Sequence, residues 1–327
     1  MSASKIEWTE VTWNPVPGCD RISPGCDHCY AMTMARRLKA MGSAKYQNDG
    51  DPRTSGPGFA VTMHRESVLE PIFKWSRKSQ VVFLDSMSDV YHARVSADFH
   101  GRLFATMALT PQHSYQVLTK RPGPDARSAG RRRPSANGDD GCPVGSWPQQ
   151  SKHADMEHPL AVRADRWGCP WPLPNVWLGT SIESDEYAWR ADDLRKTPAA
   201  VRFLSLEPLL GPLPRLDLGG FDQVITGGES GPGARPMDPH WARTIRNQCR
   251  AKGVAFLHKQ TVNGQQQAST VPGFCTAQGF TAQQRRTLRT DSCSTKSCSV
   301  GKKAAGRELD GHTWDEFPMP FERRDSA

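Results

Sequence analysis

Short apolar runs recur along the chain, and each is rich in β-branched and aromatic residues. They occupy residues 81–85 (VVFLD), 115–119 (YQVLT), 175–181 (NVWLGTS), 201–206 (VRFLSL), 223–228 (QVITGG) and 254–259 (VAFLHK). Runs of this length and composition are typical of strands that are buried on both faces of a sheet. We therefore predict six buried strands, preceded by a first strand near Val11 to Trp13.

Helical patterns lie between several of the predicted strands. Ser96 precedes ADFHGRLFATMAL and is a good N-cap residue, with an acid in the first turn. Asp238 and Pro239 open another helix, and Gly253 is placed to end it. Because strands that alternate with helices form parallel sheets, we expect an α/β fold. Six or more such units fit a complete or partial parallel (β/α) barrel better than an open Rossmann sheet of six strands.

Two long segments interrupt this alternation. Residues 122–172 are rich in Pro, Gly, Arg and Asp, and residues 261–300 are low in aliphatic residues and rich in Gln, Ser and Thr. Neither segment can bury enough apolar surface to offset the entropy lost on ordering, so we expect mobile loops there. The predicted organisation is a barrel domain over 1–260 with an irregular insertion at about 122–172, a basic low-complexity segment at 261–300, and a tail at 301–327 that packs on the barrel.

The net charge of the chain is +8, and most of it lies in one place. Residues 261–307 hold seven basic residues and one acid, Asp291, and therefore carry +6, which leaves +2 for the rest of the chain. A basic segment can hold phosphate groups without sequence preference, so nucleic acid stays open as a partner. The rest of the chain has no large excess of basic residues that would indicate a surface for nucleic acid.

Composition also bears on the compartment. Residues 1–10 contain no apolar core of a signal peptide, and no run approaches the roughly 18–20 apolar residues that cross a bilayer. We therefore expect a cytoplasmic protein without a membrane partner. In a reducing compartment, nine cysteines indicate metal or redox chemistry rather than a disulfide framework. Cys293 and Cys298 lie in the basic segment and are expected to be free thiols.

Polar side chains gather directly after the predicted strands. They are Ser86, Ser88, Asp89, Lys120, Arg121, Thr180, Ser181, Glu183, Glu207, Glu229 and Lys259. Because the carboxyl ends of the strands surround the active site of a (β/α) barrel, this pattern predicts one shared pocket. The simpler interpretation is that polar residues mark where strands emerge into water. In that case Glu229 is a capping or salt-bridged acid after a glycine turn. Lys120 and Arg121 then bind only a surface acid, whereas in a functional site they could bind phosphate.

Cys19, Cys26 and Cys29 lie within one short loop that leads into a helical segment. Structural zinc sites usually close with four ligands that come as two close pairs, whereas this loop has one close pair and one further thiol. His28 would have to point against the neighbouring thiols to become a fourth ligand. Three thiolates instead suit a [4Fe–4S] cluster that leaves one iron open for a small molecule. Zinc and unligated thiols are the alternatives.

Seven stretches in chain order resemble the uncharacterised phage-type three-Cys-motif family labelled gp-thirty-seven/gp-sixty-eight. They are KIEWTEVTWNPVPGCDRISPGCDHCYA, FLDSMSDVYH, YQVLTKRP, PNVWLGTSIES, VRFLSLEPLLGP, VITGGESGPGARPM and GRELDGHTWDEFP, and together they span most of the chain. The family is itself similar to radical S-adenosylmethionine enzymes, in style closest to those of the spore-photoproduct-lyase type. Six and then two residues separate the cysteines here, where most of that superfamily has three and then two.

The resemblance implies a radical S-adenosylmethionine enzyme. Cys19, Cys26 and Cys29 would hold a [4Fe–4S] cluster whose open iron binds S-adenosyl-L-methionine, and an electron donor would start cleavage of this cofactor to a 5′-deoxyadenosyl radical. The expected contacts are Ser86, Ser88 and Asp89 for the cofactor's amino group, Lys120, Ser181 and Glu183 for its carboxylate or ribose, and Glu207 and Glu229 for the substrate, as catalytic candidates.

The resemblance leaves the substrate undefined, with nucleic acid or a nucleotide as candidates. The alternative function is a noncatalytic nucleic-acid-binding protein that zinc stabilises. The two functions differ in the metal that the cysteines hold and in whether the cofactor is cleaved.

Overall fold

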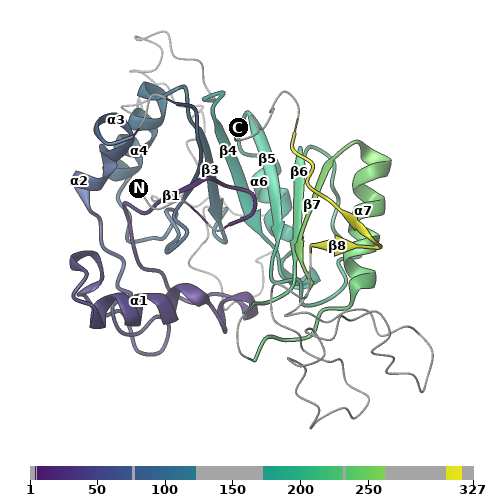
Figure 1. Ribbon diagram of the computed structural model, residues 1–327, viewed down its shortest axis with the longest axis horizontal. Helices are drawn as coiled ribbons and strands as arrows, with labels where there is room; N and C mark the ends of the chain where they lie inside the picture. Colours follow the sequence, from purple (N-terminus) through teal and green to yellow (C-terminus); the bar gives the residue numbers. More distant parts are fainter. Residues whose placement is uncertain are drawn as a thin grey trace, which may run out of the picture. The chain divides into compact units, whose positions relative to one another are not determined.

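Parallel strands form the framework of each of the two compact units of the protein (Figure 1). The computed structural model describes residues 4, 6–75, 78–122, 172–230, 233–261 and 307–318. The chain divides into two compact units, of which the first comprises Met1–Ser181 and Trp189–Leu204 and the second Ile182–Ala188 and Ser205–Ala327. The predictions for the insertion and the basic segment, including Cys293 and Cys298, fall almost entirely outside the described residues.

Four strands of the first unit lie side by side and run parallel. They are β1 (Val11–Trp13), β2 (Val81–Leu84), β3 (Ser114–Thr119) and β4 (Val176–Ser181). Val11, Val82, Tyr115 and Val176 lie opposite one another in register across the four strands. Because this register keeps the strand ends aligned, the loops that follow β1, β2 and β3 leave the sheet at the same edge.

Helices and a further strand complete the first unit. They are α1 (Tyr30–Ala40), α2 (Arg65–Val68), α3 (Glu70–Phe73), α4 (Ala97–Leu109), α6 (Trp189–Arg195) and the first residues of β5 (Val201–Leu206). In the core, Trp8 packs against Phe83 and Phe203, with ring centroids 4.5 and 6.2 Å apart. A Cβ on Gly179 would lie 2.3 Å from the Phe203 ring, so only glycine lets this ring pack against β4.

The second unit is built on two parallel strands, β6 (Gln223–Gly227) and β7 (Ala255–Gln260). Helix α7 (Pro239–Lys252) packs on both strands (Figure 1). Near the end of the chain, β8 (Glu308–Leu309) and β9 (His312–Thr313) form an antiparallel pair. The next residues join β7, since the His258 N–H donates to the Trp314 carbonyl at 3.0 Å and the Glu316 N–H to the Phe256 carbonyl at 3.2 Å.

The apolar pattern predicted these elements closely. The run at 201–206 coincides with β5, and the other five runs match their strands to within one residue at each end. Side-chain oxygens of Ser96 and Asp238 accept backbone N–H groups at 3.3 and 2.8 Å and cap α4 and α7. Gly253 ends α7 with a φ of +66°.

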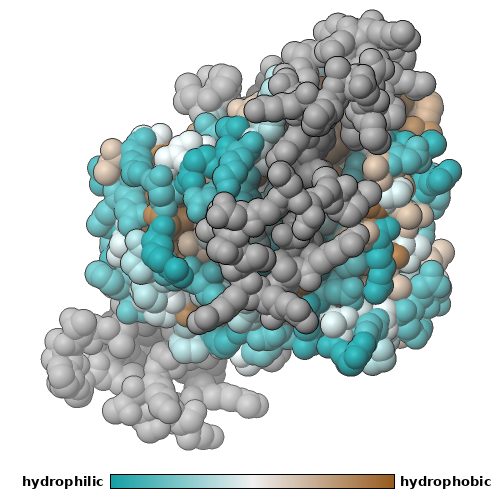
Figure 2. Space-filling view, turned by 180° about the vertical axis from the view of Figure 1, so that it is seen from behind, coloured by the Kyte–Doolittle hydropathy of each residue, from teal (hydrophilic) through white to brown (hydrophobic). Residues whose placement is uncertain are grey.

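The prediction of an α/β fold with a parallel sheet is confirmed. Within the first unit the strand order from β1 to β4 follows the chain, and within the second unit β7 lies next to β6. Hydrophilic side chains dominate the described surface visible in Figure 2, where apolar ones are scattered. Within the described ranges, no helix is long and apolar enough to cross a membrane.

Candidate functional site

The loop after β1 carries the three cysteines, and a glycine at its start lets it pass close to a neighbouring segment. Gly18 has a φ of +100°, and a Cβ there would lie 2.1 Å from the Ala60 carbonyl oxygen. The Gly18 N–H donates to the Met87 carbonyl at 3.1 Å, and the Asn14 side-chain oxygen accepts the Met87 N–H at 2.9 Å. These bonds fix the loop after β1 to the loop after β2.

Cys26 and Cys29 flank the turn that leads into α1. Cys26 ends a one-turn 3₁₀ helix (Pro24–Cys26), and its carbonyl accepts the N–H of Cys29, the residue before α1, at 3.3 Å. Cys19, Cys26 and Cys29 are all free thiols and half-buried. Cys19 and Cys29 pack against an apolar cluster formed by Ala31, Ala35, Tyr46, Phe59 and Met87.

Burial governs the protonation of two of these thiols. Burial raises the pKa of Cys19 to about 12, although the Arg121 guanidinium acts in the opposite direction. Burial also raises the pKa of Cys29, where backbone N–H groups and the Lys120 ammonium lower it. Both thiols are therefore protonated at neutral pH in the metal-free chain, and a metal ion would have to displace their protons.

Arg121, which follows β3, connects to the cysteine loop. Its Nη1 donates to the Cys19 sulfur at 3.3 Å and to Asp89 Oδ2 at 2.9 Å, and its Nη2 donates to the Asp20 carbonyl at 2.8 Å. The side chains of Arg121 and Asp89 are only 4% and 6% exposed. The guanidinium therefore joins the loops after β1, β2 and β3 in a buried position.

The Asp89 carboxylate is held by several groups of the chain itself. Besides Arg121, it accepts the Thr119 hydroxyl at 2.6 Å and the N–H groups of Tyr91 and Lys120, each at 3.1 Å. Burial alone would raise the pKa of Asp89, but the guanidinium and these hydrogen bonds outweigh it, so the pKa lies below its usual value. Asp89 is thus an ionised partner of Arg121, although it was predicted to contact the cofactor's amino group.

Asp20 anchors the other side of the cysteine loop. Its carboxylate accepts the Thr54 hydroxyl at 2.6 Å and lies 2.9 Å from His92 Nε2 and 3.6 Å from Arg94. Burial opposes ionisation of Asp20, but the hydrogen bonds from Thr54 and His92 prevail and lower its pKa. The residue after Cys19 is therefore fixed through its side chain as well as through its carbonyl.

Asp85, directly after β2, is a buried carboxyl group that we did not predict as a site residue. Its φ is +63°, in the left-handed region that is uncommon outside glycine. Burial raises the pKa of Asp85 well above its usual value, although the nearby Ser88 hydroxyl lowers it. Burial therefore favours the neutral, protonated form of Asp85 over its carboxylate in the folded protein.

The two serines predicted at the end of β2 are half-buried and lie beside the cysteine loop. The Ser86 hydroxyl is hydrogen-bonded to the Asn14 side chain at 3.1 Å. Ser88 forms an isolated parallel bridge with Gly18, the residue before the first cysteine. The structure thus brings both serines next to the start of the thiol loop.

Lys120 directly follows β3, and Ser181 is the last residue of β4 in the same unit. The half-buried Lys120 lies close enough to Cys29 to affect the pKa of its thiol. Ser181 is buried, and its carbonyl accepts Arg190 Nη1 at 2.9 Å. Among the predicted residues, the first unit gathers the three cysteines with Ser86, Ser88, Asp89 and Lys120.

Three predicted acids belong to the second unit. Glu207 follows β5 and forms an ion pair with Lys259 of β7 at 2.5 Å, with side chains 18% and 15% exposed. Glu183 is fully buried. A Cβ on Gly227 would lie 3.3 Å from Glu207 Cδ, so glycine leaves room for this ion pair.

Glu229 is a salt-bridged acid, which is the simpler of the two interpretations of the sequence. Its carboxylate accepts the Arg235 N–H at 2.9 Å and Arg235 Nε at 3.0 Å, and Nη2 of the same arginine binds the other oxygen. Glu229 is 5% exposed. This forked pair compensates its charge within the unit.

The thiols fit an iron–sulfur cluster by kind and number, since three free thiols share one loop and Cys26 interacts electrostatically with both Cys19 and Cys29. Among the residues that the structure describes, however, no three His, Cys, Asp or Glu side chains already converge as a metal-ion site. The fit therefore rests on the chemistry of the donors.

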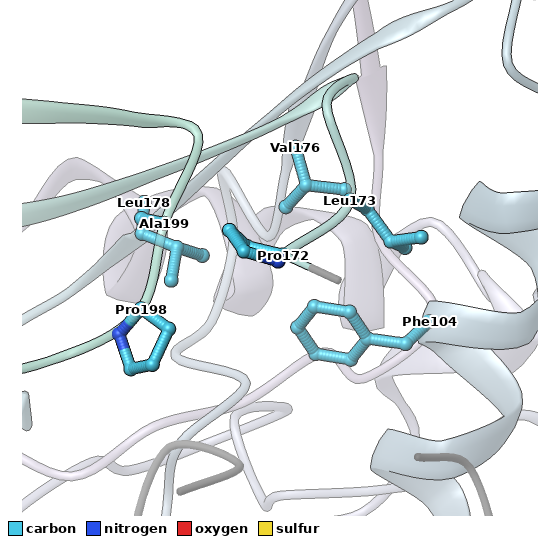
Figure 3. A pocket seen from close by; sticks show the side chains of 7 residues that line it. All are labelled: Phe104, Pro172, Leu173, Val176, Leu178, Pro198 and Ala199. Carbon is cyan, nitrogen blue, oxygen red and sulfur yellow. The ribbon is translucent and has the colours of Figure 1, made fainter. Parts of the chain in front are cut away.

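A small apolar hollow lies elsewhere in the first unit (Figure 3). Its lining consists of Phe104, Pro172, Leu173, Val176, Leu178, Pro198 and Ala199. None of these side chains is titratable, and none was predicted as a site residue. The polar groups around Cys19, rather than this hollow, are the candidate site.

Comparison with known proteins identifies one family. The sequence profile of a family described as Protein of unknown function (DUF5131) matches residues 3–318. Neither the curated proteins nor the solved structures give a match. The profile covers nearly the whole chain, so it includes the thiol loop and all the predicted strands.

Proposed function

We propose that this chain, which belongs to the DUF5131 family, is an iron–sulfur enzyme of the radical S-adenosylmethionine type in which Cys19, Cys26 and Cys29 hold a [4Fe–4S] cluster. The observation that carries this proposal is the position of three free thiols on one loop at the carboxyl edge of a parallel sheet. Ligands of α/β enzymes bind at this edge. A partial or complete (β/α) barrel of the radical S-adenosylmethionine type belongs to the same proposal.

Three thiolates leave one iron of such a cluster without a protein ligand, and this is where the cofactor would bind. A cluster held by Cys19, Cys26 and Cys29 and reduced by an external donor would supply the one electron that reductive cleavage of S-adenosylmethionine needs. The protein has to hold the thiols together, orient the cofactor and exclude water. The packing of the half-buried Cys19 and Cys29 against an apolar cluster supports the last of these roles.

The half-buried polar groups beside the thiol loop are the proposed cofactor contacts. Ser86 and Ser88 offer hydroxyl groups for an amino group, and Lys120 offers a cation for a carboxylate. Ser181 and Glu183 stay predictions for the carboxylate or ribose. Asp89 has its charge compensated by Arg121, so we assign it to the support of the loop.

Glu207 is the proposed acid for substrate contact, and Lys259 is its partner. Glu229 is less suited to this role because Arg235 already binds both of its oxygens. The substrate class stays open, with nucleic acid or a nucleotide as candidates.

Anaerobic reconstitution of the full chain with iron and sulfide tests the cluster. We expect broad absorbance at roughly 400 nm that is lost in each of the variants Cys19→Ala, Cys26→Ala and Cys29→Ala. Cys249→Ala is the matched control, since Cys249 is a buried free thiol on α7 and lies outside the loop. Tight stoichiometric zinc without iron–sulfur absorbance would overturn the proposal in favour of a zinc-stabilised binding protein.

A further inference from the structure

The Cys19 sulfur is the only one of the three loop thiols for which the described structure gives a hydrogen bond from a charged side chain. Arg121 Nη1 lies 3.3 Å from it, and the same nitrogen lies 2.9 Å from Asp89 Oδ2. The Cys26 sulfur instead lies 3.8 Å from the Ser23 hydroxyl. The three thiols therefore have different electrostatic surroundings.

Hydrogen bonds hold both the backbone and the guanidinium of Arg121. Thr119 Oγ1 accepts the Arg121 N–H at 2.8 Å and itself donates to Asp89 at 2.6 Å. Nη2 donates to the Asp20 carbonyl, so the guanidinium binds both the sulfur of Cys19 and the backbone next to it. An ion pair that served only to join β2 to β3 would not need these two bonds to the cysteine loop.

We propose that Arg121 is a positioning residue that orients Cys19 and stabilises negative charge on its sulfur, and that Asp89 limits this effect by compensating the guanidinium charge. Hydrogen bonds and positive charge near a ligating sulfur make a cluster easier to reduce. The inference rests on the proposed function only where it concerns the cluster. The hydrogen bond from Arg121 to the Cys19 sulfur is also present in the metal-free chain.

Two variants separate this role from simple structural support. Arg121→Met removes the charge and the hydrogen bond, whereas Asp89→Asn keeps the guanidinium and removes the charge that compensates it. If Arg121 acts through its charge, the two substitutions should shift the reduction potential of the cluster and the reactivity of Cys19 in opposite directions. If Arg121 only supports a buried network, both substitutions should shift each quantity in the same direction. Arg121→Lys, which keeps the charge but not the planar fork, should fall between wild type and Arg121→Met.

In the reconstituted protein, the readout is the reduction potential of the cluster, followed by electron paramagnetic resonance during a redox titration. We expect a more negative potential for Arg121→Met and a more positive one for Asp89→Asn. Shifts in the same direction, or potentials equal to that of wild type, would overturn the proposal.

In the metal-free chain, the readout is the rate of alkylation of each thiol by iodoacetamide at one fixed pH, measured by peptide mass spectrometry. Relative to Cys26 and Cys29, Cys19 should react several-fold more slowly in Arg121→Met and several-fold faster in Asp89→Asn. A loop that merely opens would expose Cys19 and speed its reaction in both variants, which would refute the role of Arg121. If wild type binds no cluster but this pattern is found, the proposed function fails and the inference on Arg121 stands.

Discussion

Gly18 and the carbonyl of Ala60 approach so closely that no side chain fits between them: a Cβ on Gly18 would lie 2.1 Å from that oxygen. Since Gly18 precedes Cys19 and has a φ of +100°, this contact sets the point at which the thiol loop begins. A larger residue would have to move the loop away from residues 60–61, and Cys19 with it.

We therefore expect Gly18→Ala to destabilise the fold and to weaken cluster binding. Gly42→Ala is the matched control, because Gly42 has a φ of +76° but nothing within 4 Å of its added Cβ. The control should cost only the strain of a positive φ, about 1 kcal/mol, and Gly18→Ala clearly more. Urea unfolding and iron content measure the two effects, and equal losses of stability would show that the close contact is unimportant.

The buried carboxyl of Asp85 makes stability depend on pH in an unusual direction. Because its pKa is raised in the folded protein, the unfolded chain releases this proton at a lower pH than the folded chain does. The contribution of Asp85 therefore becomes less favourable as the pH rises above about 4. Asp85→Asn should stabilise the protein at pH 7, on the order of 1 kcal/mol or more, and the gain should shrink toward pH 4.

The comparison variant is Asp98→Asn on α4. A hydrogen bond from Arg102 lowers the pKa of Asp98, so this substitution should cost stability above pH 4 rather than add to it. Chemical unfolding across this pH range gives both curves. If Asp85→Asn is less stable than wild type at every pH, the Asp85 carboxyl stabilises the folded protein, and the prediction that its burial costs stability is wrong.

The ion pair between Glu229 and Arg235 should respond unequally to removal of its two partners. Glu229 has a side chain that is 5% exposed, whereas that of Arg235 is 30% exposed. Arg235→Met leaves a carboxylate buried without its main partner, at a cost of about 3–5 kcal/mol, while Glu229→Gln leaves an arginine that can turn toward water. Urea unfolding of the two variants checks this order, and a larger loss for Glu229→Gln would show that Arg235 has no route to solvent.

The sequence predicted strands and helix ends well because their causes are local. Apolar runs such as 201–206 and caps such as Ser96 and Asp238 are visible within a few residues. The thiol loop was found in the same way, from the spacing of its cysteines. The strands and the helix caps are confirmed, whereas the role of the thiol loop stays a prediction.

The contacts that define the site depend on the folded chain. Arg121 and Asp89 are 32 residues apart and meet only because β2 and β3 pair in one register. Neither Asp20 nor Asp85 was predicted as a site residue, because the surroundings of these carboxyl groups cannot be read from the sequence. The shared pocket expected at the polar ends of the strands stays a prediction, and sequence could not tell acids with a compensated charge, such as Asp89 and Glu229, from available ones.

The most direct test of the proposed chemistry is to reduce the reconstituted protein with dithionite in the presence of S-adenosylmethionine and to measure 5′-deoxyadenosine by liquid chromatography. We predict 5′-deoxyadenosine and methionine in equal amounts from wild type and from Cys249→Ala, and none from Cys19→Ala, Cys26→Ala or Cys29→Ala. A wild-type protein that carries a reduced [4Fe–4S] cluster and yet forms no 5′-deoxyadenosine would contradict the assignment.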